Sequence, residues 1–571
     1  MNFAVNGIPG GNSTVGTVNS QNGKYVAPSA LPTPSTVTLT ATSSLAPGAV
    51  GSLTITLMGP GMPPPAPSPA PAPSPSPSPS PSPSPAPAPA PSPAPAPDSA
   101  TLAAARFLEQ ASFGPTPADI NRVKQIGAAA WLDEQLAWPA STIPVGSSSV
   151  EPVIRDWYQR MVSGPDQLRQ RMIFALSQVL VVSTEKNPYG DEIVPWLQTL
   201  SKHAFGNFGA LLKELTINPA MGKYLDLGNS ATPVPNENYA REVMQLFTIG
   251  LHLLNQDGTL QLDATGAPIP SYDQVRVNEL ARALSGWTYA GASPTGLNYQ
   301  NMSGPLQPRE SYHDRGSKTL LLGATLPAGQ SAAQDMDASL NNLLAHPNLA
   351  PFIATRLIRA FVTSNPSPAY VQRVAQAFAN GPQGRGDLSA ALRAVLLDSE
   401  ARQDAATATQ GRLKDAILHT VGLVRSLGGQ VNDPITLSYD YFKMGQRLTA
   451  APSVFNFYSP LTRLPGNPGY YGPEFQIYGA SYSIARANFI YSVLNGDIKS
   501  IVSIDLTPYV NAAPDTQALI NLVDRNLLQG RMSSPTRQAL ATGIAASTDM
   551  RQRALTALYL TAIAADFAVH R

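Results

Sequence analysis

A helical fold is indicated most clearly by the segment Pro235-Asn236-Glu237-Asn238-Tyr239-Ala240-Arg241-Glu242-Val243-Met244-Gln245-Leu246-Phe247-Thr248-Ile249-Gly250. At about 100° per residue, a helix over this segment has one polar face and one apolar face. The polar arc holds Glu237, Asn238, Arg241, Glu242 and Gln245, and the apolar face holds Tyr239, Val243, Leu246, Phe247 and Gly250. Asn236 is placed to cap the helix, and Glu237 can pair with Arg241. Taken alone, the segment is an amphipathic helix with a solvated face.

Apolar positions with helical spacing recur through the chain beyond residue 98. Asp98 and Thr116 are placed to cap the first two helices, and Pro117 suits a first helical turn. Further helical patterns cover residues 153–162, 168–181, 211–215, 237–250, 275–287, 340–344, 353–362, 388–397, 413–427, 484–494, 519–528 and 554–564. There is no sustained βαβ alternation and no fixed repeat. We predict a mainly α fold, a large multi-helix domain over residues 99–571 with loop or hairpin insertions within 288–324 and 452–476.

Residues 1–60 show the two-residue alternation of half-buried strands instead. Apolar side chains alternate with threonine at Val37, Leu39 and Ala41, and again at Leu53, Ile55 and Leu57. The segment resembles the second half of a bacterial Ig-like repeat, whereas a whole Ig-like sandwich needs about seven strands and about a hundred residues. We therefore predict a truncated Ig-like β module and expect the true start, with its export signal, to lie upstream of Met1. The alternative is a short β module that folds by itself.

Residues 61–98 form a linker that is almost entirely Pro, Ser and Ala. Such a sequence cannot bury apolar surface and favours polyproline II, which extends by about 3.1 Å per residue. Linkers of this kind tether modules in secreted bacterial hydrolases and raise adhesins from cell surfaces. We predict that the protein is secreted or displayed at the cell surface.

Composition excludes several classes of function. The formal net charge of +1 in 571 residues argues against nucleic-acid binding and against a polybasic membrane-binding segment. No apolar window has the length of a membrane-spanning helix. The chain has no Cys, so disulfides, thiol nucleophiles and Cys-based zinc sites are excluded. Phosphate-binding glycine motifs and the Gly-x-Ser-x-Gly nucleophile elbow are also missing.

Four further strings accompany residues 235–242, which we call the signature segment. They are Asn218-Pro219-Ala220-Met221 with Tyr224-Leu225-Asp226, Glu279-Leu280-Ala281-Arg282-Ala283-Leu284-Ser285-Gly286-Trp287, Tyr312-His313-Asp314 with Lys318-Thr319-Leu320, and His346-Pro347 with Arg356-Leu357-Ile358. Together they resemble the bacterial family known as domain of unknown function 1800, over roughly residues 100 to 500. The resemblance implies an exported or surface protein and brings no agreed reaction. The resemblance also implies a partner, a protein that is encoded by a neighbouring gene and resembles alkaline phosphatases. Gln245 stands where the family tends to have Glu, and Ser285 where it usually has Thr.

Carboxylates around the signature segment are the candidate acid and base groups. Glycoside hydrolysis uses two carboxylates about 5 to 9.5 Å apart across a cleft. Glu237 and Glu242 diverge by about 140° around a helix axis, so one of them would have to work with a group from elsewhere. We predict catalytic roles for Glu237, Glu242, His313 and Asp314. Substrate-positioning roles are predicted for Asn236, Asn238, Arg241, Trp287 and Lys318.

Two other uses of these residues stay open. No cofactor is predicted, but His313 or Asp314 beside a Glu-bearing helix also offers ligands for a divalent metal. Adjacent residues of a strand point to opposite faces, so only one of the two would bind it. Aromatic clusters at residues 439–442, 455–458 and 470–471 are either sugar-stacking platforms or ordinary loop packing.

The leading hypothesis is an exported hydrolase that acts on an extracellular polymer such as a polysaccharide, by carboxylate or histidine acid–base chemistry. The competing hypothesis is a non-catalytic surface or matrix-binding protein whose signature residues form a structural ion network. It predicts that Arg241 and Glu242 are buried and paired with each other, with no open cleft nearby. The expected partner in both cases is a glycan or another extracellular polymer.

Overall fold

The computed structural model describes residues 2–19, 25–30, 32–33, 35–42, 50–57, 98–144, 148–403 and 410–570. The chain divides into two compact units, Met1–Pro89 and Ala90–Arg571. The predicted linker lies outside the described residues apart from Asp98. In the part of the chain that is described, no helix is both long enough and apolar enough to cross a bilayer.

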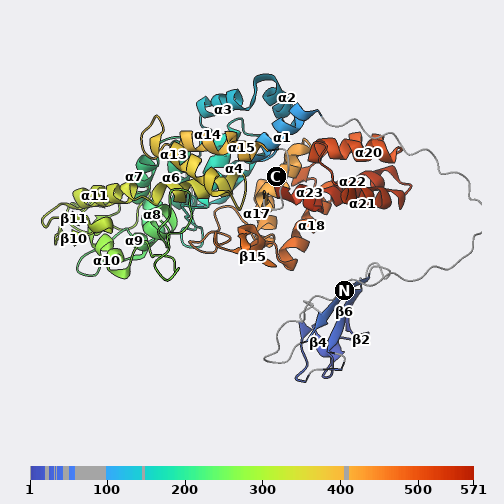
Figure 1. Ribbon diagram of the computed structural model, residues 1–571, viewed down its shortest axis with the longest axis horizontal. Helices are drawn as coiled ribbons and strands as arrows, with labels where there is room; N and C mark the ends of the chain where they lie inside the picture. The colour runs from blue at the N-terminus through green and yellow to red at the C-terminus, as the bar shows by residue number, and fades with distance from the viewer. Residues whose placement is uncertain are drawn as a thin grey trace, which may run out of the picture. The chain divides into compact units, whose positions relative to one another are not determined.

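The first unit consists of two small antiparallel sheets, drawn in blue in Figure 1. One has the order β2-β1-β6-β7, made of β1 (Asn2–Val5), β2 (Ile8–Pro9), β6 (Thr36–Thr42) and β7 (Val50–Thr56). The other contains β3 (Gly11–Asn12), β4 (Gly16–Val18) and β5 (Tyr25–Val26). Val5, Val18 and Val37 form the buried centre of this first unit, and Val37 of β6 pairs with Ile55 of β7. The Ig-like resemblance and the upstream export signal stay predictions.

The second unit is mainly α, as predicted. Its first helices are α1 (Ser99–Ala111), α2 (Pro117–Ile126), α3 (Ala128–Ala137), α4 (Glu151–Ser163), α5 (Gln167–Ser177), α6 (Gly190–His203), α7 (Phe208–Thr216) and α8 (Pro219–Tyr224). Side-chain caps set several of the starts, because they satisfy backbone N–H groups that have no partner inside the helix. Asp98 caps α1 and Thr116 caps α2, as predicted, and Asn218 caps α8 in the same way.

The middle of this unit alternates helices with short hairpins. The helices are α9 (Asn238–Glu242), the π-helix η1 (Val243–Thr248), α10 (Gln274–Ala283), α11 (Ala332–Ala345), α12 (Leu349–Phe361), α13 (Pro368–Asn380), α14 (Leu388–Leu397) and α15 (Ser399–Arg402). The predicted insertion within 288–324 contains β9 (Gln307–Pro308), η2 (Glu310–Tyr312), β10 (Lys318–Thr319) and η3 (Leu321–Gly323). β8 (Trp287–Thr288) begins one residue before it, and β11 (Thr325–Leu326) follows it directly. α10 is shorter than predicted because Gly286, at a φ of +81°, turns the chain into β8.

The C-terminal part has a smaller core of its own. It contains β12 (Arg412–Leu413), α16 (Ala416–Ser426), β13 (Gln430–Val431), α17 (Pro434–Lys443), β14 (Arg463–Leu464), β15 (Asn467–Tyr471), η4 (Pro473–Ile477), α18 (Ala480–Asn495), β16 (Val502–Ser503), α19 (Thr507–Ala512), α20 (Thr516–Val523), η5 (Asp524–Leu528), α21 (Ser534–Ala545), α22 (Met550–Ile563), α23 (Ala565–Ala568) and β17 (Val569–His570). Leu519, Leu540 and Leu558 lie at the centre of the smaller core. Figure 1 shows these red helices at one end of the unit and green α8–α11 at the other.

The signature segment differs from the predicted helix in two respects. α9 begins at Asn238 with Glu237 at the cap position, although Asn236 Oδ1 still accepts a hydrogen bond from the Asn238 N–H at 2.8 Å. After Glu242 the α-helix widens into the π-helix η1. The wide turn buries Val243, Met244, Leu246, Phe247 and Thr248, which is more than one face of an α-helix would bury. A regular apolar spacing predicts a helix here but carries no signal for that change.

Candidate functional site

The signature segment places its first charged pair at the surface. Arg241 bonds Glu237 Oε1 at 2.7 Å, as predicted, and Gln274 on α10 bonds both partners, at 2.9 and 2.6 Å. The hydrogen bond from Arg241 is the largest cause of a lowered pKa at Glu237. Glu237 is therefore an ionised, half-exposed group that is already engaged with a cation.

Glu242, the second carboxylate of the segment, turns inward. The residue is 7 % exposed, and its Oε2 has no hydrogen-bond partner among the described residues. Burial raises the pKa of Glu242, and the charge of Arg241 only partly offsets that effect. Glu242 in turn adds to the effect of burial in raising the pKa of Tyr224 to about 12. Buried but not bonded to Arg241, Glu242 does not have the partner that the structural-network hypothesis predicted.

The string that ends at Asp226 meets the signature segment directly. Asn238 Nδ2 donates to Asp226 Oδ2 at 3.3 Å, and Lys186 Nζ lies 2.6 Å from the other carboxylate oxygen. Asn236 is held from its main chain, whose N–H donates to Ser230 Oγ at 2.9 Å. Asp226 and Asn229 both have positive φ, at 60° and 68°, which is uncommon outside glycine and found often at functional sites.

The structure separates His313 from Asp314. Asp314 accepts two hydrogen bonds from Arg282, at 2.9 and 3.0 Å, and these are the largest cause that lowers its pKa to about 2. His313 points the other way, with Nε2 3.1 Å from Asp335 Oδ2. Lys318 Nζ binds the same oxygen at 2.7 Å. The side chains of His313, Lys318 and Asp335 are at most 1 % exposed, so these three form a closed buried ion cluster.

A chain of contacts from Ser285 through His313 to Asp335 has the composition of a serine-hydrolase triad but not its geometry. His313 Nδ1 lies 2.9 Å from the main-chain oxygen of Ser285, to which it can only donate, and 3.4 Å from Ser285 Oγ. A nitrogen that donates to a carbonyl cannot take the serine proton. Ser285 Oγ is itself used, donating to the Arg282 carbonyl at 2.7 Å and accepting from the Asp314 N–H at 2.9 Å. The contacts therefore hold a loop.

A cavity that could admit a ligand lies against η1. It has a volume of about 410 Å³ and is walled by η1, residues 249–260, α12 and residues 455–471. Gln245 lines it, one turn after Glu242 on the same helical segment, and the Tyr272 hydroxyl donates to Gln245 Oε1 at 3.1 Å. Burial, with a smaller contribution from Glu242, raises the pKa of Tyr272, which bonds Gln245, but Glu242 itself does not line the cavity.

The opposite wall of this cavity carries two arginines that were not among the predicted site residues. Arg356 and Arg359 project from α12, and Phe455 and Tyr471 line the same cavity from two of the aromatic clusters. Two arginines three residues apart in the apolar sequence of α12, with no acidic residue within four positions, are a signal that could have found them. Trp287, a predicted positioning residue, is buried and does not line this cavity.

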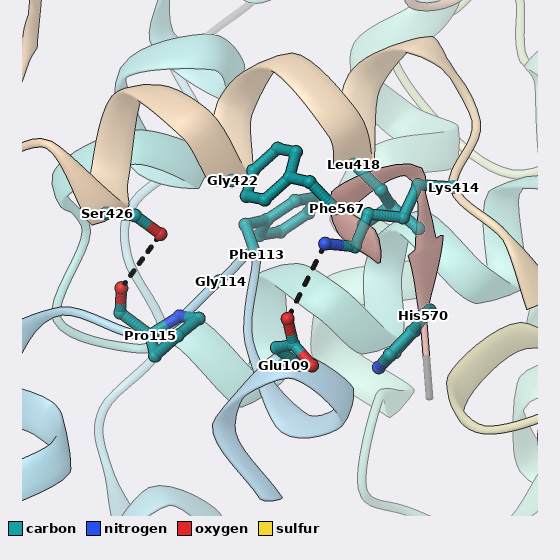
Figure 2. Close-up of a pocket in the computed structure, with 10 residues that line it drawn as sticks. All are labelled: Glu109, Phe113, Gly114, Pro115, Lys414, Leu418, Gly422, Ser426, Phe567 and His570. Atoms are coloured by element: carbon teal, nitrogen blue, oxygen red, sulfur yellow. Dashed lines mark hydrogen bonds and ion pairs between the residues drawn. The ribbon is translucent and has the colours of Figure 1, made fainter. Parts of the chain in front are cut away.

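A second, much smaller cavity has a different character. Figure 2 shows Glu109 of α1 facing Lys414, with His570 of β17 beside them, around a volume of about 10 Å³. Glu109 lies 3.5 Å from Lys414 and 2.9 Å from Arg531. Burial by itself would raise the pKa of Glu109, but the charges of Arg531, Lys414 and His570 lower it to about 2. This cluster ties the two ends of the helical unit together.

Metal binding gains no support from the positions of the ligating residues. Throughout the described ranges, no three His, Asp or Glu side chains are grouped closely enough to hold a metal ion. His313 and Asp314 are occupied by Asp335 and Arg282.

Comparison with known proteins identifies the family. The family model described as "Protein of unknown function (DUF1800)" matches residues 106–569, which is most of the chain, so the chain belongs to this family and the predicted resemblance is confirmed. No curated protein and no solved structure matches the chain.

Proposed function

We propose that this member of the DUF1800 family is an exported hydrolase that acts on an extracellular polymer, a polysaccharide in the first instance, with Glu242 as its acid group. The observation that carries the proposal is the environment of Glu242. Its side chain is buried, its Oε2 has no hydrogen-bond partner among the described residues, and its pKa is raised. Buried carboxyls with a raised pKa are typical of general acids, and Glu242 lies one turn before Gln245, which lines the cavity. In hydrolysis such a group gives its proton to the leaving oxygen, and water supplies the hydroxyl to the other fragment.

Among the predicted acid–base residues, Glu242 has the environment best suited to this role. Glu237 and Asp314 are held ionised by Arg241 and Arg282, and His313 is enclosed with Asp335 and Lys318. A carboxylate in a strong ion pair cannot readily take or give a proton near neutral pH. The proposed roles of Asn238 and Arg241 are to hold the segment, through Asp226 and Glu237 respectively.

A second candidate function is non-catalytic binding at the cell surface. The observation that favours it is the closed cluster of His313, Lys318 and Asp335. Two of these residues, His313 and Lys318, were predicted to act on the substrate, and the cluster gives them a role in stabilising the fold instead. In that case Glu242 is only a buried acid, and the protein retains its polymer without cleaving it.

The two functions are separated by incubating the full chain with a panel of neutral and acidic polysaccharides and measuring new reducing ends. We expect Glu242→Gln to lower turnover by at least about a hundredfold, since general acid catalysis contributes about 10²–10⁴-fold. Glu237→Gln is the matched control, and its turnover should stay within about threefold. Full activity in a folded Glu242→Gln variant contradicts the assignment, and polymer retention with no cleavage by the wild type supports the second function.

A further inference from the structure

The cavity beside η1 carries positive charge without a matching acid. Among the residues that line it are Arg356, Arg359 and His252, and no Asp or Glu. Arg356 makes no hydrogen bond or ion pair with any described residue, and its Cζ lies over the ring of Phe352, 5.1 Å from the ring centroid. Burial, followed by the charge of Arg359, lowers the pKa of Arg356 to about 9. Two arginines held close together repel each other, and a bound anion would relieve that cost.

Arg359 is held in place before any ligand arrives. Its guanidinium donates to the carbonyls of Ser364, at 3.0 Å, and Pro460, at 3.3 Å. It also lies over the ring of Tyr471, with 4.0 Å between its Cζ and the ring centroid. The carbonyls carry no formal charge, and the charge of Glu474 also acts on the Arg359 guanidinium. The Arg359 side chain is therefore already in position for an anion, which lowers the conformational entropy that is lost on binding.

Behind the two arginines the cavity continues into a smaller polar chamber. This chamber, of about 50 Å³, shares Arg356, Arg359 and Pro460 with the larger cavity and is also lined by Gln178, Arg412 and Glu474. Glu474 is 4 % exposed and bonds Arg412 at 2.9 Å through Oε1. Glu474 Oε2 and Gln178 Nε2 have no hydrogen-bond partner among the described residues. Unpaired buried polar atoms beside a chamber that can hold water mark the polar end of a binding site.

The outer end of the cavity is apolar and faces solvent. Four lining side chains are among the exposed large hydrophobic residues of the protein: Leu251, Leu260, Phe455 and Leu461. Leu246, Ile249, Leu254 and Phe352 continue the same surface inward. A mostly aliphatic wall packs against alkyl groups, whereas sugar rings are usually stacked on aromatic faces. Exposed apolar side chains gathered around one opening indicate a binding site.

We propose that this cavity binds a single-chain amphiphilic anion, such as a medium-chain carboxylate, with its charged head on Arg356 and Arg359 and its alkyl chain along the leucines of the mouth. The polar chamber lies behind the head and supplies water-mediated contacts through Glu474 and Gln178. Because binding needs no turnover, the proposal stands independently of polymer hydrolysis by Glu242.

The test measures binding of decanoate to the full chain by isothermal titration calorimetry. We expect one saturable site, with affinity rising by about fourfold for each methylene from hexanoate to decanoate. Decanol, which has the same chain without the charge, should bind at least about tenfold more weakly, as expected when a charge-assisted hydrogen bond is lost. Equal binding of decanol and decanoate would overturn the anion site. Tighter binding of tri-galacturonate than of decanoate would identify an acidic-sugar site and overturn the alkyl assignment, and so would absence of saturable binding.

Three variants locate the binding to this cavity. Arg356→Gln removes a guanidinium that makes no polar contact with any described residue, so the fold should be retained, and decanoate affinity should fall by at least about tenfold. Arg463→Gln is the matched control, because Arg463 also lies over Tyr471, at 3.9 Å, but does not line the cavity. The decanoate affinity of the Arg463→Gln variant should stay within about twofold of the wild-type value. Gln245→Glu adds a carboxylate to the cavity wall, which repels the carboxylate of decanoate, and should weaken decanoate binding by at least about tenfold. Unchanged affinity in both Arg356→Gln and Gln245→Glu contradicts the proposal.

Failure of this proposal and failure of the proposed function are distinguishable. Glu242 does not line the cavity, so Glu242→Gln should bind decanoate as the wild type does. Loss of turnover with intact decanoate binding would be consistent with both assignments, whereas loss of decanoate binding in Glu242→Gln would contradict the separation of the two groups.

Discussion

Charged side chains in and around the signature strings have opposite environments, which their residue types alone do not reveal. Asp314 and Glu237 are compensated by arginines, and Asp335 is compensated by Lys318 and His313. Glu242 and Arg356 have no such partner among the described residues. Since an unpaired buried group costs stability, its retention points to a role in binding or chemistry more than a paired one does.

Asp335 provides the test of the structural role at this scale. Asp335→Asn removes the nearer counter-charge of the buried Lys318 ammonium, 2.7 Å away, and leaves only Asp314 Oδ1 at 3.7 Å, so the free energy of unfolding should fall by about 3–5 kcal/mol. Chemical denaturation of the full chain, followed by circular dichroism, measures the change. Glu237→Gln is the control, because its pair with Arg241 is exposed and such pairs contribute about 1 kcal/mol or less. A loss below about 1 kcal/mol in Asp335→Asn would show that the cluster is not stabilising.

At the scale of elements, the change from α9 to η1 positions the cavity wall. A π turn inserts one extra residue into the helical repeat and rotates the side chains that follow. All residues of η1 except Gln245 are buried, and Gln245 lines the cavity. α12 supplies the facing wall with its arginines, so the site depends on two elements more than a hundred residues apart in the chain.

Thr248 tests the contribution of this wide turn. Its hydroxyl donates to the Val243 carbonyl at 2.5 Å inside the π-helix, and the residue is fully buried. Thr248→Val keeps the shape and removes this bond, so we expect a loss of about 1 kcal/mol in the free energy of unfolding. Thr542→Val removes a bond of the same kind on exposed α21, where Thr542 donates to the Gln538 carbonyl at 3.1 Å, and should cost less. No loss of stability in Thr248→Val would mean that the π turn gains nothing from this bond.

Across the whole helical unit, its first and last segments are joined by the ion cluster around Glu109. β17 pairs with β12, and His570 lies beside Glu109 and Lys414 as Figure 2 shows. The pKa of Glu109 in the folded protein is about 2, below its ordinary value of 4.5. The ionised carboxylate therefore contributes stability that is fully present above pH 4.5 and is lost as the pH falls toward 2.

Glu109→Gln should expose this dependence on pH. At pH 7 the variant should lose about 3 kcal/mol in the free energy of unfolding, and the difference from the wild type should shrink as the pH falls from 4.5 toward 2. Thermal unfolding of both proteins between pH 2 and pH 8 measures the difference. Glu134→Gln, in an exposed pair with Arg122, serves as the control and should show little pH-dependent change. A difference that does not depend on pH would rule out this account of the cluster.

Local patterns in the sequence were sufficient for the class of fold, the starts of several helices, the loop insertion after residue 288 and the family. Helical spacing and capping act over a few residues, so Asp98, Thr116 and the pairing of Glu237 with Arg241 could be predicted. The partners of buried charges are set by packing between distant elements, and no local pattern joins His313 to Asp335 or places Arg356 opposite Gln245. Only the tertiary structure could therefore decide which charged residues stabilise the fold and which ones face a cavity unpaired.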